Sequence, residues 1–324
     1  MSTPAPLSFG QTLRYLGESA LVFPFMALFR LLGIDAASAL GGFIGRHLYC
    51  RLPPANTARK NLKAAYPDMA RKEIERTVRE ICDNLGRVVA EYPHLDKLTL
   101  GDRIELAGKE NGDAAVASGK GVMFISGHFS NWETMPVTAA LLGYDASLVY
   151  RPPNNPFVDR WISRQRAKGG HQEQITKGVQ GTRRIFTLLR RGKSVLLLVD
   201  QKTYQGVPAP FFGRDAMTTA APASFALKLG SILLPASAER LDGARFRVTI
   251  HPPIGFEPSG DYDKDVLALT AKINATIEAI VRQRPSQWLW VHRRWTTPRD
   301  LLKQKAQALG GAGAAVAREG SSFT

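Results

Sequence analysis

Cysteine is scarce in this chain: among 324 residues, only Cys50 and Cys82 are present. They form no C-x-x-C pair, which excludes the usual zinc and dithiol redox motifs, and two thiols cannot build a disulfide framework. The sequence therefore predicts no metal site and a reducing, cytoplasm-facing environment. Cys82 falls in a helical apolar stripe, so packing in the core is the expected reason for it.

Acidic residues are also few. Twenty-eight Asp and Glu stand against forty-three Lys and Arg, which gives a formal net charge of +15. A field of this sign attracts nucleic acid, an acidic protein or an anionic phospholipid surface. The sequence has no zinc-finger spacing, RRM signature or basic zipper, and its basic residues are scattered as pairs. Nucleic acid is therefore not expected as a partner.

Extended apolar runs are rare, but one lies near the N-terminus. Residues 20–29 (ALVFPFMALF) are continuously apolar, Arg30 interrupts the run, and residues 31–34 resume it. A membrane-spanning helix needs about 20 apolar residues, and no convincing signal-peptide cleavage site follows. We expect a helix inserted in the membrane surface or a tilted single span, although a buried helix of a soluble protein would give the same pattern.

Helical and strand patterns alternate along the rest of the chain. Amphipathic helices are expected over residues 71–92 and 265–284, because their apolar residues recur every three or four positions. The alternation between these helices favours an α/β fold, with a central mixed sheet covered by helices. The expected strands are 122–126, 147–150, 195–199, 232–236 and 246–250, and the expected helices are 132–142, 157–168, 182–191 and 222–229.

The stretch from His128 to Glu133 (HFSNWE) is the most informative candidate site. It follows the apolar run 122–126 and a glycine, so an imidazole and a carboxylate leave the end of a strand, where α/β proteins place active sites. A neutral imidazole suits a general base, and a nearby carboxylate can fix its tautomer. The structural alternative is a capping box, in which Ser130 and Glu133 begin the next helix.

Charged side chains follow three further predicted strands. Arg151 comes directly after one strand, Asp200 after the next, and the pair Glu239-Arg240 after a third. Because the carboxyl ends of parallel strands lie at one edge of a sheet, Arg151 and Asp200 are expected near His128. Each also has a structural alternative: a surface arginine, a turn cap, and a local salt bridge between Glu239 and Arg240.

Six segments in a fixed order carry a family resemblance. They are 127–133 (GHFSNWE), 149–159 (VYRPPNNPFVD), 199–201 (VDQ), 211–219 (FFGRDAMTT), 232–240 (ILLPASAER) and 287–295 (QWLWVHRRW). With them the chain resembles the bacterial lipid A late acyltransferases, the lauroyl and myristoyl transferases. That family lies within the lysophospholipid acyltransferase superfamily, whose signature is His-x4-Asp/Glu. The resemblance covers roughly the last four-fifths of the chain.

The resemblance implies a glycerol-phosphate-acyltransferase-like fold. The acyltransferase domain is expected over residues 51–302. The apolar run places a membrane-associated helical segment before it (1–50), and the Gly-, Ala- and Ser-rich composition after Lys303 predicts a disordered tail (303–324). The resemblance implies O-acyl transfer without a cofactor, in which His128 is the general base and Glu133 its partner. An acceptor hydroxyl would attack a thioester directly, with no acyl-enzyme. Candidate substrate-binding residues are then Asn131, Arg151, Asp200, Gly213 and Arg240.

The resemblance also implies partners and a location. The donor would be acyl carrier protein, whose acidity suits the positive field, and the acceptor an anionic lipid A precursor. The active site would face the cytoplasm at the inner membrane, in contact with its phospholipids. The glycerophospholipid branch holds its acceptor phosphate with a Glu-Gly-Thr-Arg tetrad, whereas residues 211–214 are Phe-Phe-Gly-Arg. A lysophospholipid is therefore a less expected acceptor than another glycolipid.

Other functions are compatible with the same residues. The chemistry could act on another glycolipid or a lysophospholipid, or water could replace the acceptor, as in a thioesterase. A non-catalytic membrane-binding protein would use the basic surface alone. Acyl length, the acceptor position and the choice between carrier protein and coenzyme A as donor leave no readable pattern in the sequence.

Overall fold

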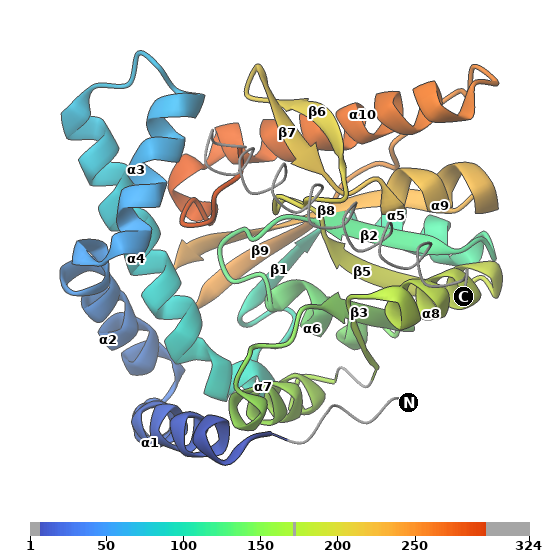
Figure 1. The fold of residues 1–324 in the computed structure, drawn as a ribbon. Helices are drawn as coiled ribbons and strands as arrows, with labels where there is room; N and C mark the ends of the chain where they lie inside the picture. Colours follow the sequence, from blue (N-terminus) through green and yellow to red (C-terminus); the bar gives the residue numbers. More distant parts are fainter. Residues whose placement is uncertain (1–6, 171–172, 296–324) are drawn as a thin grey trace, which may run out of the picture.

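The computed structural model describes residues 7–170 and 173–295, which form an α/β fold around one main sheet (Figure 1). Seven strands make this sheet in the order β1–β9–β8–β2–β5–β3–β4. Strands β2, β3, β4, β5 and β8 run parallel, whereas β9 is antiparallel to β8 and β1 runs with β9. The mixed sheet covered by helices is thereby confirmed. The strands are β1 (Ile104–Ala107), β2 (Val122–Ser126), β3 (Ala146–Tyr150), β4 (Gln174–Thr176), β5 (Ser194–Leu198), β8 (Ile232–Asp242) and β9 (Arg245–Ile250).

The central strand β2 is buried on both faces, which explains its continuous apolar run. Val122 and Phe124 pack in one core with residues of α5 (Lys109–Ala117) and α6 (Thr134–Leu141). Met123 and Ile125 pack in the opposite core. That second core is closed by α8 (Val179–Arg190), α9 (Ala221–Leu229) and α10 (Tyr262–Gln283).

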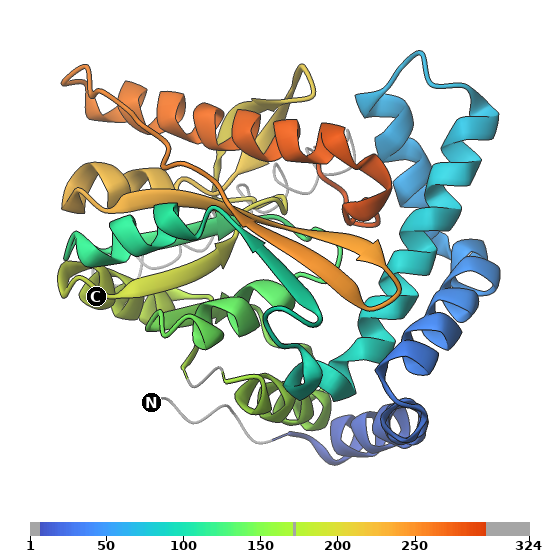
Figure 2. The ribbon, with the colours of Figure 1, turned by 180° about the vertical axis from the view of Figure 1, so that it is seen from behind.

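The N-terminal helices stand beside the sheet. Figures 1 and 2 show α2, α3 and α4 as a column at one side, with α1 and α7 together at the edge opposite α10. The apolar stripe expected over residues 71–92 is buried, with Val78 and Val88 fully enclosed. The bounds are α1 (Phe9–Leu32), α2 (Ile34–His47), η1 (Tyr49–Arg51), α3 (Pro53–Ala65), α4 (Arg71–Glu91), η2 (Tyr92–Lys97) and α7 (Pro156–Lys168).

Glycines bring α2 and α4 into backbone contact. A Cβ atom added to Gly45 would lie 2.0 Å from the carbonyl oxygen of Cys82, and one added to Gly86 would lie 2.0 Å from that of Gly41. No side chain fits at such distances, so the pair of helices depends on glycine at these positions.

Helix α1 carries the apolar run predicted near the N-terminus. It begins earlier than that run, with a capping box between Ser8 and Gln11. Within the described part of the chain, α1 is the one helix long and apolar enough to cross a membrane, and 22% of that apolar window is buried. One narrow stripe packs on the protein, while a second apolar face is open: Phe9, Leu13, Leu16, Leu21, Phe25, Leu28, Leu31 and Leu32.

Several elements differ from the sequence expectation. Helix α6 begins at Thr134 and not at residue 132, and β8 continues to Asp242, well beyond residue 236. The hairpin of β6 (Val207–Phe211) and β7 (Arg214–Thr218) was not expected, since prolines within a run argue against a strand. Strands β1 and β4 are four and three residues long and lie at the two edges of the sheet, so they are too short to give a clear sequence pattern. The tail expected from residue 303 lies outside the described residues.

Candidate active site

The carboxyl ends of β2 and β5 bring His128 beside Asp200. The two strands are parallel neighbours and pair Ser126 with Leu198, so the residues two positions further on meet. The imidazole Nδ1 of His128 lies 2.8 Å from Oδ1 of Asp200, and the backbone N–H of His128 donates to Oδ2 at 2.7 Å. The Asp200 side chain is 2% exposed and that of His128 15% exposed. The expectation that strand ends would gather these residues is confirmed.

This contact defines the tautomer of the imidazole. A carboxylate that accepts from Nδ1–H leaves Nε2 of a neutral ring unprotonated, which is the form a general base requires. Nε2 lies 3.3 Å from Nε2 of Gln201, whose amide can donate to it. The indole N–H of Trp288 donates to Oδ2 of Asp200 at 2.7 Å.

The Asp200 carboxyl is strongly acidic in this setting. Its burial alone would raise its pKa, but the charge of His128 and the hydrogen bonds from His128 and Trp288 outweigh burial and lower the pKa of Asp200 to about 2. The carboxylate therefore stays ionised throughout the neutral range, and it can stabilise an imidazolium at His128.

Glu133 occupies a different environment from the one expected. Its carboxylate accepts two hydrogen bonds from Arg166, at 2.7 and 2.9 Å, and one from the Tyr92 hydroxyl at 2.6 Å. Burial alone would lower the pKa of Arg166, but the charge of Glu133 outweighs burial and raises the pKa of Arg166. For Tyr92, burial and the charge of Glu133 act in the same direction, and both raise its pKa. The carboxylate that holds Nδ1 of His128 is Asp200, so the expected pairing of His128 with Glu133 is corrected.

The loop between His128 and Glu133 explains this difference. Ser130 has φ of 48°, a left-handed conformation that is uncommon outside glycine and turns the chain before α6 begins. The capping box given as the structural alternative at Ser130 is not formed. Asn131 caps the turn instead: its Oδ1 accepts from the N–H of Glu133 at 3.1 Å. Glu133 itself is the N-cap residue of α6.

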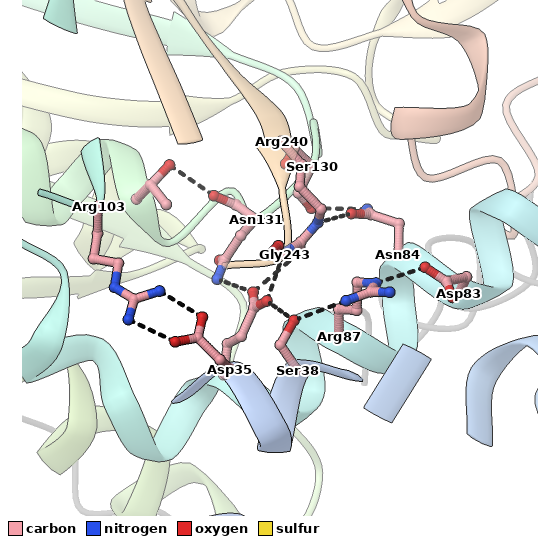
Figure 3. Close-up of polar contacts among 12 residues, drawn as sticks. Asp35, Ser38, Asp83, Asn84, Arg87, Arg103, Ser130, Asn131, Arg240 and Gly243 are labelled. Atoms are coloured by element: carbon pink, nitrogen blue, oxygen red, sulfur yellow. Dashed lines mark hydrogen bonds and ion pairs between the residues drawn. The ribbon is translucent and has the colours of Figure 1, made fainter. Parts of the chain in front are cut away.

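Asn131 and Arg240 belong to a buried polar network around Glu91 of α4 (Figure 3). Asn131 donates to one carboxylate oxygen of Glu91 at 2.8 Å, and Ser38 of α2 donates to the other at 2.6 Å. Arg240 binds both oxygens, at 2.5 and 3.1 Å, and also Asn84 at 3.0 Å. These two candidate residues therefore tie the His128 loop to α4.

The local salt bridge given as the structural alternative for Glu239 and Arg240 is not formed. Neighbouring residues of a strand point to opposite faces, so Arg240 turns inward to Glu91. Glu239 instead lies 2.8 Å from Arg284.

A cavity of about 450 Å³ opens beside His128, at the carboxyl ends of the parallel strands. His128, Glu133 and Arg151 line it, so the structure brings Arg151 to the predicted place. One part of its wall is apolar, with Trp132, Pro136, Leu148, Leu196 and Leu198; another part is cationic, with Arg151, Arg166, Lys177, Lys202 and Arg293. Burial and the charge of Arg151 lower the pKa of Lys177 against the effect of Asp200. Gly213, with φ of 67°, lies in the β6–β7 turn and not in this wall.

The segment 287–295 closes the site from the C-terminal side. The backbone N–H of Leu289 donates to the carbonyl of His128 at 3.1 Å, and Asn61 of α3 holds the carbonyls of Trp290 and His292. The basic run 292–294 is not a uniformly exposed surface stripe, because Arg294 is buried. It is 1% exposed and donates to Thr218 at 2.8 Å.

The residues of the site that had no assigned role in the sequence include Glu91, Tyr92, Arg166 and Trp288. Glu91 ends an apolar helical stripe, and a carboxylate on such a stripe is a signal that can be read. Trp288 lies in a segment of the resemblance. Arg166 and Tyr92 carry no pattern of their own.

The arrangement is suited to general base catalysis on a hydroxyl. A histidine with a defined tautomer, a carboxylate behind it and an adjacent cavity that is part cationic and part apolar are its components. Within residues 7–170 and 173–295, no group of three His, Cys, Asp or Glu side chains is arranged to hold a metal ion.

Comparison with known proteins agrees with this chemistry. Relatives include a lipid A biosynthesis acyltransferase of Haemophilus influenzae, 25% identical over 80% of this chain and 83% of the relative. The lipid A biosynthesis palmitoleoyltransferase of Escherichia coli is 26% identical over 74% and 78%. A phosphatidylinositol mannoside acyltransferase of Mycobacterium tuberculosis is 23% identical over 64% of each chain. The sequence model of the bacterial lipid A biosynthesis acyltransferases matches residues 8–297, so the chain is an acyltransferase that belongs to this family.

Proposed function

We propose that this acyltransferase moves a fatty acyl chain from the thioester of acyl carrier protein to a hydroxyl of a lipid A precursor. The observation that carries the mechanism is the hydrogen bond between His128 and Asp200 beside the cationic and apolar cavity. Family membership supports lipid A as the acceptor class.

The proposed step needs no acyl-enzyme. Nε2 of His128 takes the proton of the acceptor hydroxyl, and the oxygen of that hydroxyl attacks the thioester carbonyl carbon at the same time. Asp200 stabilises the imidazolium that forms. The carbon–sulfur bond then breaks, the thiolate leaves with the proton from His128, and an oxygen ester remains on the acceptor. The balance requires no cofactor and no water.

We assign the two substrates to parts of the cavity from the charge and polarity of the residues that line it. Arg151 and Lys177 would hold phosphate groups of the acceptor or the thioester oxygen as charge develops on it. The apolar wall of Leu148, Leu196 and Leu198 would receive the acyl chain. Acyl carrier protein is acidic, so the net charge of +15 would favour its approach.

We place the enzyme at the cytoplasmic face of the inner membrane, and helix α1 supports the membrane association in this proposal. Asn155 binds the carbonyl of Tyr15 near the start of α1, and Arg30 near its end binds Asp96 and the carbonyl of Pro93. These contacts are about 22 Å apart along the helix. The α/β fold therefore runs beside the length of α1, which favours a helix lying in the membrane surface with its open apolar face in the lipid.

The test is acyl transfer by the purified full chain in mixed micelles, with an acyl carrier protein thioester and a lipid A precursor. His128→Ala is expected to fold and to lose at least about a thousandfold in rate. His47→Ala, which removes an exposed histidine at the end of α2, is the matched control and should keep the wild-type rate. Near wild-type turnover by His128→Ala would contradict the proposed base, and free fatty acid as the only product would contradict transfer.

Another glycolipid is the second candidate acceptor, because one relative is named for a mannosylated phosphoinositide. A panel of both acceptor types in the same assay separates them. Mass spectrometry of lipid A from a strain without the protein gives an independent answer: loss of one secondary acyl chain would identify both its length and its position.

A further inference from the structure

A second groove, separate from the His128 cavity, lies between α1 and α7. Figures 1 and 2 both show these helices side by side, and the groove has a volume of about 530 Å³. None of the residues that line it lines the His128 cavity. It is large enough for part of a lipid and is open on one side.

The floor of this groove is apolar. Phe23 and Met26 come from α1, and Phe157 and Trp161 from α7. Met26 packs in the small core that joins α1 to α4, and Trp161 packs against that core. The groove is therefore continuous with α1, whose apolar outer face is open.

The rim of the groove is cationic. Arg160, Arg164 and Lys168 recur every four residues of α7, which places them in one row along its exposed side. Within residues 7–170 and 173–295, no carboxylate lies within ion-pairing distance of these three cations. A fourth cation, Arg30, lines the groove from α1 but is paired with Asp96 at 2.8 Å.

We propose that this groove binds a phospholipid with an anionic headgroup, such as phosphatidylglycerol. The row of cations on α7 would hold the phosphate, since arginine and lysine donate well to phosphate oxygens. The acyl chains would lie on the apolar floor. An acidic protein helix is a less suitable occupant, because the floor offers no polar partner for its side chains. The inference rests on the membrane placement of α1 in the proposed function, because only there does the groove face lipid.

The groove also lies directly behind the active site. The rings of Trp161 and Tyr92 are 6.5 Å apart, and Tyr92 donates to Glu133. Gln165 lines the groove, and the next residue along α7, Arg166, holds Glu133. A lipid in the groove would thus contact the helix that supports the Glu133 side of the cavity.

Quenching of tryptophan fluorescence by brominated lipids tests this site in the full chain. Brominated phosphatidylglycerol and brominated phosphatidylcholine are titrated separately into micelles of a nonionic detergent. Phosphatidylglycerol is expected to half-saturate the quenching at a mole fraction at least about tenfold lower than phosphatidylcholine. Trp161→Phe should remove the saturable component, which assigns it to the groove.

The triple variant Arg160→Gln/Arg164→Gln/Lys168→Gln should lose the preference for phosphatidylglycerol. Its matched control removes the same charge from the α8 region and keeps the preference: Arg183→Gln/Arg190→Gln/Arg191→Gln. Equal quenching by the two lipids in the wild type, or the same preference in both triple variants, would overturn the proposal. So would a triple variant that raises the KM for acyl carrier protein while its lipid preference stays unchanged, because the groove would then be a carrier-protein site.

These outcomes are distinct from failure of the proposed function. Flotation with phosphatidylglycerol vesicles reports whether the protein binds membranes at all, and the transfer assay reports catalysis. A protein that floats and transfers acyl groups, but shows no Trp161 quenching, refutes only the lipid groove.

Discussion

Nδ1 of His128 lies 2.8 Å from Oδ1 of Asp200, a residue 72 positions further along the chain. The pair sits at the carboxyl ends of two neighbouring parallel strands. A carboxylate in this position holds the ring in one tautomer and stabilises its protonated form. The charge of Asp200, and not that of Glu133, which is nearer in the sequence, should therefore have the larger effect on His128 as a general base.

Asp200→Asn is therefore expected to lower kcat by about three to four orders of magnitude. The amide keeps the shape of the side chain but can donate to Nδ1, which favours the wrong tautomer. KM should change by less than about threefold, since Asp200 is buried and lies behind the imidazole. The transfer assay measures both parameters.

Asp145→Asn is the matched control for this substitution, because Asp145 is exposed and pairs with Lys193 at the surface. It should keep the wild-type kcat. An Asp200→Asn enzyme within about tenfold of wild type would contradict the role of the carboxylate.

Arg166→Met should destabilise the fold by about 3–5 kcal/mol. The substitution removes the guanidinium that binds both oxygens of Glu133, and both side chains are at least nine-tenths buried. Adding Glu133→Gln should recover a large part of the loss, because a neutral amide costs less to bury than a carboxylate. Denaturant unfolding of the single and double variants measures this coupling.

Arg184→Met provides the comparison for an exposed pair. Arg184 binds Glu173 at 2.7 Å, but both side chains are open to solvent, so the expected loss is below about 1 kcal/mol. If Arg166→Met costs no more than this control, the buried pair does not hold α7 to the active site.

The sequence was sufficient to place His128, Asp200 and Arg151 at one edge of a sheet. Each follows an apolar run, and parallel strands end at the same edge whatever their order. It was not sufficient to identify the carboxylate at Nδ1. Which carboxylate accepts from Nδ1 depends on the register of β2 with β5 and on the left-handed backbone of Ser130. The local periodicity of the sequence predicts neither feature.

The partners of Glu133 were unpredictable for a related reason. Arg166 lies 33 positions away and Tyr92 lies 41 positions away, on two elements whose packing follows from the tertiary fold. The partner of Arg240 could not be predicted from the sequence either. Its sequence neighbour Glu239 suggested a local pair, whereas the alternation of strand side chains sends it to Glu91.

Acid should remove a defined part of the stability through Asp200. Its pKa is lowered from an ordinary value of 3.8 to about 2, so the native state favours the ionised carboxylate. This contribution is fully present above the unfolded pKa and is lost as the pH falls through the folded pKa, between about pH 4 and pH 2. For a shift of this size the loss is on the order of 2 kcal/mol.

The measurement is the free energy of unfolding of wild type and Asp200→Asn at several pH values from 6 to 2.5. The variant lacks the carboxyl, so the difference between the two proteins should shrink as the pH falls below about 4. A difference that stays constant over this range would show that Asp200 has an ordinary pKa in the folded protein.

Gly45→Ala should weaken the contact between α2 and α4. The new methyl group would lie 2.0 Å from the carbonyl oxygen of Cys82, a backbone atom that cannot rotate away, so the helices must separate. Overpacking of this kind costs about 1–3 kcal/mol, and the Tm in detergent should fall accordingly. Because α4 carries Glu91, which holds Asn131 of the His128 loop, the transfer rate below the Tm should fall as well.

Gly17→Ala is the control: Gly17 lies in α1 with open space around its Cα, so alanine there should leave the rate unchanged and stabilise the helix by about 0.5–1 kcal/mol. If both alanine variants melt at or above the wild-type Tm, close packing of α2 on α4 does not position the loop.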